Sequence, residues 1–380
     1  IGLGIPAEPL FRSSYPVLFL ALAAFALWDG LYHDVEVHYG QVIKRYGWFE
    51  GLERISEDEA SYRNCHFVLK YHGRWAKYPY AMEARNGYGK LTTGHTMVPY
   101  ILNQYDDTDE GADETMKEKI KTICQWEFVC NQDGDFVVQE RALDKEGNLI
   151  FIYNRSATSN PRKVISTYTD DYGFPLMLRD SAYFYIRTTY DERGFETLME
   201  FYDDQGMPIT NRDSVYQTRR FYLDNGVESA EFSCFLDGRR TIDRFGNCGW
   251  IAEFSDDSLR TIESTFVDAD LNYCRSTDDS VIVKRYKYDE HGRIIEESYW
   301  DEEGKPDTCS YGYHAQCLEY NRYGQVTRFY ILGCDSLPCI AKNGLKEIIH
   351  EYDEWGNEIL LENVLEEGID GYKYEYTDDG

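Results

Sequence analysis

The sequence predicts an all-β fold, an elongated array of tandem antiparallel β-hairpin repeats with a period of about 32 residues, behind an N-terminal transmembrane helix. Three observations predict it: an excess of aromatic residues, a recurring turn motif and one apolar segment near the start. The chain has 33 Tyr, 19 Phe and 7 Trp, so that aromatic residues make up 16% of it. Such a composition suits pleated sheets better than helix bundles.

The turn motif is an aromatic or apolar residue, then usually Asp, then two residues and Gly. The degenerate copy Phe254–Ser258 fills one gap in the series, and the period is 32 residues, once 34. A second copy follows about 12 residues after the first in each period, at 202, 235, 266, 300, 332 and 364. Complete copies begin at Leu143, Tyr190, Tyr202, Tyr222, Tyr288, Trp300, Tyr320, Tyr352 and Tyr376.

The chemistry of this motif is that of a turn between two strands. Asp accepts hydrogen bonds from the amides ahead of it, Gly takes the positive φ, and the aromatic residue ends the incoming strand. We therefore expect two turns per period, with a longer step that opens with Pro208, Pro306 or Pro338 and holds a loop before the next strand. Stacked hairpins are expected to bury a continuous apolar stripe.

These turns, and the Gly-x-Pro sequences Gly206–Pro208 and Gly304–Pro306, resemble the YD-type and RHS-type hairpin repeats of bacterial surface proteins. The resemblance covers roughly 190–380. The alternating long and short steps depart from the nearly fixed period of YD arrays, which puts a closed RHS-type shell in doubt. Residues 39–89 also resemble a segment that follows a transmembrane helix in bacterial proteins with an upstream cytosolic module, chiefly at Lys44–Gly47 and Glu50–Gly51.

Residues 15–32 form the only long apolar run in the sequence, and its length of about 18 residues is the lower limit for a spanning helix. Aromatic residues lie at both ends and Arg12 precedes it, so that the positive-inside rule puts the rest of the chain outside the cytoplasm. A cleavable signal peptide ending near Ala24–Ala26 and a buried core helix are the competing interpretations. Because the chain begins at Ile1 rather than Met, we expect that a processed leader or an upstream domain has been left off.

The residues after this run predict a juxtamembrane α+β region. Val35, Tyr39, Val42, Ile43 and Tyr46 recur at helical spacing, which favours a helix ending near Gly47. Ser56–Glu59 has the pattern of a capping box, and 67–71 and 75–82 flank His72–Arg74 as a hairpin. The expected organisation is an anchor at 1–36, a juxtamembrane region at 37–120 and the repeat domain at 121–380.

Charge and cysteine content exclude several partners and cofactors. With 68 acidic and 39 basic residues the formal charge is −29, which argues against nucleic acid as a partner. The ten cysteines contain no CxxC pair, so that a zinc site is not indicated. Cys334 and Cys339 bracket a turn and could form a disulfide in an oxidising compartment.

The sequence carries no catalytic signature, and we expect no catalytic, cofactor-binding or metal-binding residues. His314 and Cys317 are close enough to suggest a thiol–imidazole pair, but we interpret them as ordinary strand residues. His33 and His38 are read as interfacial side chains. The acidic loop 106–114 is expected to be solvated rather than a calcium site, because Lys117 stands where an EF-hand needs Glu.

The expected function is a non-enzymatic, membrane-anchored repeat protein acting as a structural or interaction subunit of a membrane or cell-surface assembly. Its partners are expected to be proteins, with membrane contact through residues 15–32 and no cofactor. The alternative is an extracytoplasmic sensor domain that binds a glycan, a peptide or a phage component. A glycosidase built on two facing carboxylates is the third, enzymatic hypothesis.

Overall fold

The computed structural model describes residues 33–93, 119–170, 172–175, 184–211, 213–277 and 279–375. The expected anchor at 15–32, the acidic loop 106–114 and the copy of the turn at Tyr376 lie outside these residues. Within the described ranges, no helix combines the length and the apolar character needed to cross a membrane.

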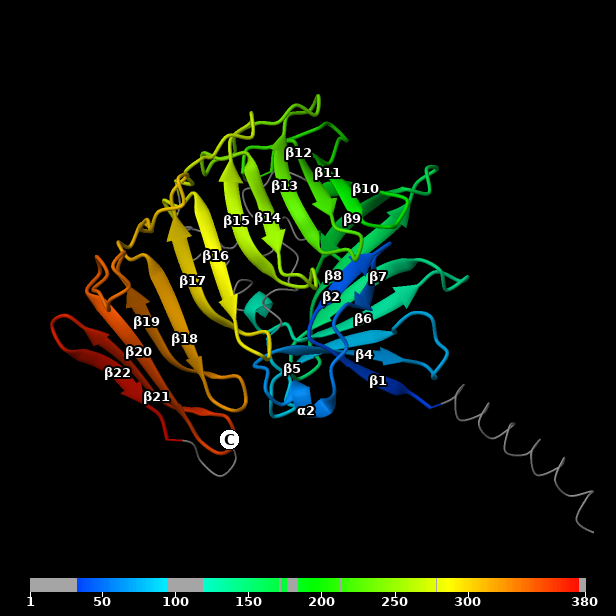
Figure 1. The fold of residues 1–380 in the computed structure, drawn as a ribbon. Coiled ribbons are helices and arrows are strands. Elements are labelled where there is room, and N and C mark those ends of the chain that lie inside the picture. The colour runs from blue at the N-terminus through cyan, green and yellow to red at the C-terminus, as the bar shows by residue number, and fades with distance from the viewer. Residues whose placement is uncertain are drawn as a thin grey trace, which may run out of the picture.

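The protein is a long antiparallel array of hairpins, as predicted, in one 20-stranded sheet. β1 pairs with β4, and from β4 onward every strand pairs with the next one along the chain as far as β22. Figure 1 shows the strands following one another around a wide arc, with α2 (Glu57–Ala60) between its two limbs. The strands of this sheet are β1 (Val35–Tyr39), β4 (His66–Tyr71), β5 (Ala81–Arg85), β6 (Gln125–Cys130), β7 (Val137–Leu143), β8 (Leu149–Ala157), β9 (Lys163–Thr169), β10 (Tyr185–Tyr190), β11 (Glu196–Tyr202), β12 (Gln217–Tyr222), β13 (Glu228–Cys234), β14 (Gly249–Phe254), β15 (Thr261–Val267), β16 (Val283–Tyr288), β17 (Ile294–Trp300), β18 (Ala315–Tyr320), β19 (Val326–Leu332), β20 (Leu345–Tyr352), β21 (Glu358–Leu365) and β22 (Ile369–Lys373).

The predicted juxtamembrane helix is wrong. Its residues form the edge strand β1 and the hairpin of β2 (Val42–Arg45) and β3 (Trp48–Gly51), which is separate from the large sheet. The apolar residues of β1 alternate with polar ones, and the segment from Val35 to Tyr39 pairs with β4 over its whole length. Strand alternation and a neighbour in the sheet therefore outweigh the helical spacing of the same side chains.

Two further local predictions are confirmed. Ser56 caps α2, and its hydroxyl accepts a hydrogen bond from the amide of Glu59 at 3.1 Å. β4 and β5 form the expected hairpin. Its second strand begins at Ala81 rather than Trp75, because residues 72–80 form a longer loop.

Most of the first turns have the predicted chemistry, although the turn after Tyr222 has Leu223 in place of Asp. The carboxylate of Asp191 accepts hydrogen bonds from the amides of Arg193 and Phe195, both at 2.9 Å. Asp289 does the same two and four residues ahead. In the degenerate copy, the hydroxyl of Ser255 accepts from the amide of Arg260 at 3.1 Å. These turns join β10 to β11, β12 to β13 and so on along the array.

The second turn of each repeat lies at the opposite ends of the strands. From residue 202 to residue 338, each begins at the last residue of a strand, and that residue forms an isolated bridge with the residue six positions later. Two expected starting positions are wrong by one residue, because Cys234 and Val267 occupy the place assigned to Phe235 and Phe266. Both are buried and end their strands, whereas the expected pattern was assigned to the aromatic residues next to them in the sequence. The expected copy at 364 is also wrong, because β21 continues to Leu365 and the chain turns directly into β22. The bridges are Tyr202 to Pro208, Cys234 to Arg240, Val267 to Tyr273, Trp300 to Pro306 and Leu332 to Pro338.

The periods between residues 190 and 345 each contain a third turn that the sequence pattern did not reveal. It follows the second turn and stacks on the equivalent turn of the preceding repeat. The amide of Thr277 donates to the carbonyl oxygen of Phe245 at 2.8 Å, and the amide of Ser310 donates to that of Asp279 at 2.7 Å. The longer connection in each repeat therefore contains a hydrogen-bonded turn in addition to the expected loop.

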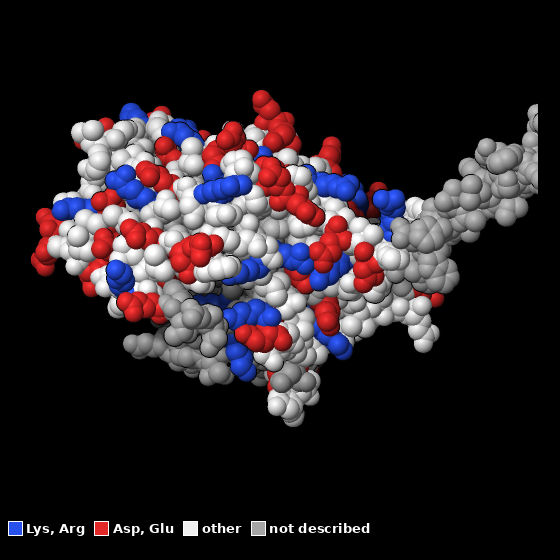
Figure 2. Space-filling model, turned by 90° about the horizontal axis from the view of Figure 1, so that it is seen from below, with Lys and Arg blue, Asp and Glu red and all other residues white. Residues whose placement is uncertain are grey.

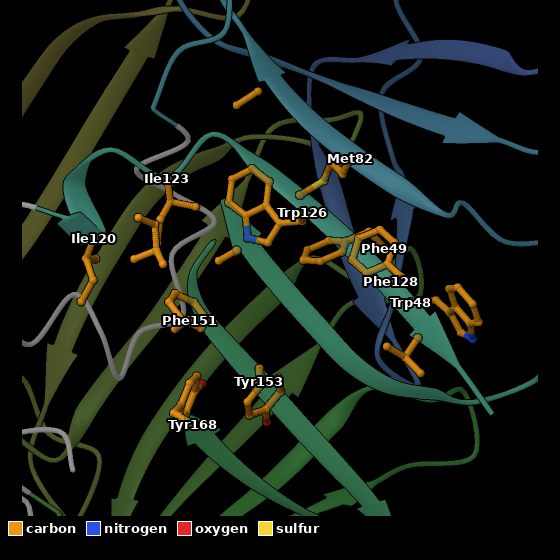
Figure 3. Close-up of a cluster of buried hydrophobic side chains, with 14 of the residues drawn as sticks. Trp48, Phe49, Met82, Ile120, Ile123, Trp126, Phe128, Phe151, Tyr153 and Tyr168 are labelled. Carbon is orange, nitrogen blue, oxygen red and sulfur yellow. The ribbon is translucent and has the colours of Figure 1, made fainter. Parts of the chain in front are cut away.

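The main core occupies the first part of the array. Its buried side chains run from Trp48 and Phe49 on the separate hairpin, across β4 to β9, to Phe201 on β11. Figure 3 shows Trp126, Phe151 and Met82 pointing into this cluster. Most residues of the strands from β14 onward are only partly buried, with a smaller cluster at Val281, Tyr299 and Cys309. The continuous apolar stripe that was predicted is therefore fully buried in the first half of the array.

Candidate functional site

The concave side of the array is occupied by its own N-terminal segment. We call residues 40–64 and 86–90 the brace, because they contact the first turns of successive repeats. At its start, the amide of Tyr46 donates to the carbonyl oxygen of Gly194 at 2.8 Å. A side chain at Gly226 would collide with Ile43 and Phe195, so that the next turn is also in close contact.

The middle of the brace contacts the following turns through charged and aromatic side chains. Glu53 forms an ion pair with Arg260 at 2.7 Å. Glu59 on α2 lies 3.2 Å from Nδ1 of His291, and the ring of Tyr62 stacks on the same imidazole with centroids 4.3 Å apart. Figure 2, which looks onto the face that is lowest in Figure 1, shows basic and acidic groups interspersed across the surface.

The end of the brace reaches the last repeats. Tyr88 stacks on Tyr323 with ring centroids 4.0 Å apart, and Nζ of Lys90 donates to the carbonyl oxygen of Trp355 at 2.9 Å. A Cβ at Gly324 would lie 2.3 Å from the amide nitrogen of Asn64. The brace thus contacts the first turns from residue 194 to residue 356, in chain order from Glu53 onward.

A buried ionic network holds the β2–β3 hairpin against the sheet. Nζ of Lys44 lies 2.6 Å from Oε2 of Glu140, whose side chain is 1% exposed. The same ammonium lies over the rings of Phe49 and Tyr153 at 4.9 and 5.3 Å. A charge removed from water is costly unless it is paired, so the network fixes where the hairpin sits.

Arg155 on β8 is the most enclosed member of the network. Its side chain has no exposed surface, and it donates to the hydroxyl of Tyr190 and lies 3.4 Å from Glu196. The guanidinium fills the space beside Gly47, where a Cβ would collide with it. Burial raises the pKa of Glu196, but the charges of Lys44, Arg155 and neighbouring groups more than offset this, and the net pKa is lowered.

The network continues into β12 and β13. Nε of Arg220 lies 2.7 Å from Glu231 and 3.7 Å from Glu228. Burial, opposed by Arg220 and reinforced by the charges of Glu231 and Glu196, raises the pKa of Glu228 to about 7. Glu228 therefore changes its protonation near neutral pH, in contact with a group that Glu231 already neutralises.

A cavity of about 190 Å³ lies beneath the third turns of three repeats. Its lining combines the aromatic rings of Phe245 and Trp250 with Asn211, Asp243 and Asp279. Burial raises the pKa of Asp243 to about 6, despite hydrogen bonds from two backbone amides. The volume is below the 300 to 1,000 Å³ that is usual for small-molecule sites.

The second turns form a surface that we call the rim. Five of the six second turns from residue 169 to residue 338 expose a large apolar side chain near their tips, where solvent would normally favour polar residues. Acidic residues lie between them. The apolar side chains and their exposed fractions are Phe174 at 68%, Met207 at 62%, Leu236 at 50%, Leu271 at 44% and Leu337 at 61%.

The structure does not bring the histidine and cysteine candidates into one site. Nδ1 of His314 lies 3.0 Å from the carbonyl oxygen of Asp307, its ring meets Trp300 edge-on, and Cys317 lies beside Tyr330. His38 contacts His66 at 3.1 Å, and His33 precedes β1.

All ten cysteines are free thiols, including Cys334 and Cys339. Among the residues described, no three His, Cys, Asp or Glu side chains form a possible metal site.

Comparison with known proteins gives weak alignments with solved structures and no match at the level of sequence. No family model matches the chain, and no curated protein does. Solved structures that align include TcdB2-TccC3-Cdc42 and TcdB2-TccC3, each at 12% identity and a TM-score of 0.26 over 83% of this chain. A mutant of the Photorhabdus luminescens Tc holotoxin pore aligns over 87% at 11% identity and a TM-score of 0.24. This chain spans 18 to 21% of those chains, and these TM-scores are too low to infer a shared architecture.

Proposed function

We propose that the protein is a non-enzymatic repeat scaffold that binds protein partners through the rim, as a subunit of a membrane or cell-surface assembly of the kind built from YD-like and RHS-like repeats. In this proposal residues 15–32 attach the chain to the membrane and the repeats lie outside the cytoplasm. The brace holds the array in one curvature, so that the rim is presented as a fixed surface.

The exposed apolar side chains in five of the six second turns from residue 169 to residue 338 are the observation that carries this proposal. An isolated apolar residue on a surface needs no explanation, but exposed apolar side chains in most turns of one series are typical of an interaction surface. Rigid presentation adds to affinity because less conformational entropy is lost when a partner binds.

A ligand-binding sensor is the second candidate function, and the cavity under the third turns favours it. Its mixture of aromatic rings and amide or carboxylate groups suits a small polar ligand such as a sugar. The cavity and the rim lie at the same ends of the strands but use different side chains, so that substitutions distinguish the two functions.

Capture of partners by matched variants tests the scaffold proposal. The rim variant carries Met207→Ser, Leu236→Ser and Leu337→Ser, and the control carries Phe221→Ser, Ile251→Ser and Ile295→Ser, which alter exposed apolar residues elsewhere on the strands. We expect wild type and control to retain the same proteins from a detergent extract and the rim variant to lose them. Equal capture by all three would contradict the proposal.

A further inference from the structure

We propose that the rim binds a basic amphipathic α-helix of a partner protein. This inference rests on the proposed function and names the chemistry of its partner. It follows from the spacing of the second turns, from the further apolar side chains exposed beside them, and from the charge between them.

The spacing of the rim matches the repeat of a helix. Successive second turns are separated by two strands, or about 10 Å. A helix rises 1.5 Å per residue, so that every seventh residue returns to the same face after about 10.5 Å. An extended strand cannot match, because its residues on one face recur at about 6.6 or 13 Å.

Further apolar side chains are exposed beside three of the second turns. Tyr273 closes its turn and is 54% exposed, and Ile242 and Ile340 lie two residues beyond theirs and are 51% and 42% exposed. A helix can contact several such side chains of one turn with residues three or four positions apart, as helices bound in grooves do. A polyproline segment returns to one face every third residue and offers only a single row.

The charge of the rim selects a basic partner. The second turns from 203 to 337 expose only two basic residues, Arg239 and Lys305, within the part that the structure describes. The fourth of these turns has no exposed apolar side chain and two adjacent carboxylates instead, which would accept a Lys or Arg of the helix. The exposed acidic residues of these turns are Asp204, Asp237, Asp270, Glu302, Glu303 and Asp335.

The test is selection from a displayed peptide library. The peptides are about 28 residues long, which spans roughly 42 Å as a helix, with apolar residues fixed at heptad spacing and all other positions varied. Wild-type protein is the bait, and the Met207→Ser, Leu236→Ser, Leu337→Ser variant measures binding away from the rim. We expect the enriched peptides to gain Lys and Arg, to bind the variant about tenfold more weakly, and to lose affinity as salt rises.

Other results of this selection would contradict the proposal. Enrichment of acidic or proline-rich peptides, or equal binding to wild type and variant, would overturn the assignment of a basic helix. If capture of natural partners still depends on the rim while no basic helix is selected, then the scaffold function stands and the partner class is wrong. If capture does not depend on the rim, then the proposed function fails first.

Discussion

The hydroxyl of Tyr222 donates a hydrogen bond to the carbonyl oxygen of Glu196 at 2.9 Å, and this bond joins one hairpin to the hairpin before it. Tyr288, Tyr320 and Tyr352 make the same bond to the residue 26 or 27 positions earlier, at 2.5 to 2.9 Å. The motif tyrosine therefore does more than end a strand. Phe254 holds the equivalent position in the degenerate copy and has no hydroxyl to donate.

Removing one of these hydroxyls should weaken the contact between adjacent hairpins. Tyr288→Phe keeps the ring and loses one hydrogen bond, leaving the carbonyl oxygen of Thr261 without this donor. We expect a loss of about 1 kcal/mol in the free energy of unfolding, measured by urea denaturation. Tyr311→Phe, at a ring that is 55% exposed, is the control and should change stability little. Equal effects of the two substitutions would show that the hydroxyl bond has no structural role.

The turn aspartates should contribute to stability in proportion to the number of amide hydrogen bonds that their carboxylates accept. Asp289 accepts from the amides of His291 and Arg293, both at 2.9 Å, and pairs with the Arg293 side chain. Asp289→Ala should cost about 1 to 2 kcal/mol, as the loss of a capping side chain does. Asp256→Ala removes an exposed carboxylate of the degenerate turn and serves as the matched control. A similar cost for both, measured by thermal unfolding, would argue against the hydrogen bonds as the cause.

Stability should depend on pH through Glu228. Its pKa is about 7 in the folded protein, while an unfolded chain releases this proton near pH 4.3. Between these values the folded state binds more protons, so that this group makes the protein less stable as pH rises from about 4.5 to 7. Glu228→Gln removes the effect.

The variant should therefore be more stable than wild type at pH 8, by about 1 kcal/mol after allowance for partial solvent screening, and the gain should vanish near pH 4.5. Arg220 keeps Glu231 as its partner in this variant. Glu302→Gln, at an exposed turn, is the control. A gain in stability that does not change with pH would refute the assignment.

Much of the array could be predicted from sequence because its turns depend on local chemistry. Asp and Gly at fixed offsets produce a turn wherever they occur, and in one first turn Ser255 substitutes for Asp with a hydroxyl. The third turns were not predicted because their first residue varies: it is Asn211, Asp243 or Ser276 in three successive repeats. Hydrogen bonds between the backbones of neighbouring repeats stabilise these turns, and no single residue type indicates them in the sequence.

The brace could not be predicted because it depends on contacts between distant parts of the chain. Glu53 meets Arg260, and Glu59 meets His291, across more than two hundred positions of sequence. The residues of β1 and β2 have apolar spacings that fit either a helix or a strand, and only pairing with β4 or docking on the sheet decides between them. The rim residues are visible in the sequence, but their exposure is not.

Paired glycine substitutions test most directly whether the brace docks on the first turns. Gly324 and Gly304 have nearly the same backbone conformation, with φ of +77° and +74°, so that Ala causes similar local strain at both. They differ in surroundings: a Cβ at Gly324 would lie 2.3 Å from the amide nitrogen of Asn64, and one at Gly304 has no atom nearer than 3.9 Å. We predict that Gly324→Ala lowers the free energy of unfolding by at least about 2 kcal/mol more than Gly304→Ala. Equal losses at the two sites would contradict docking of the brace.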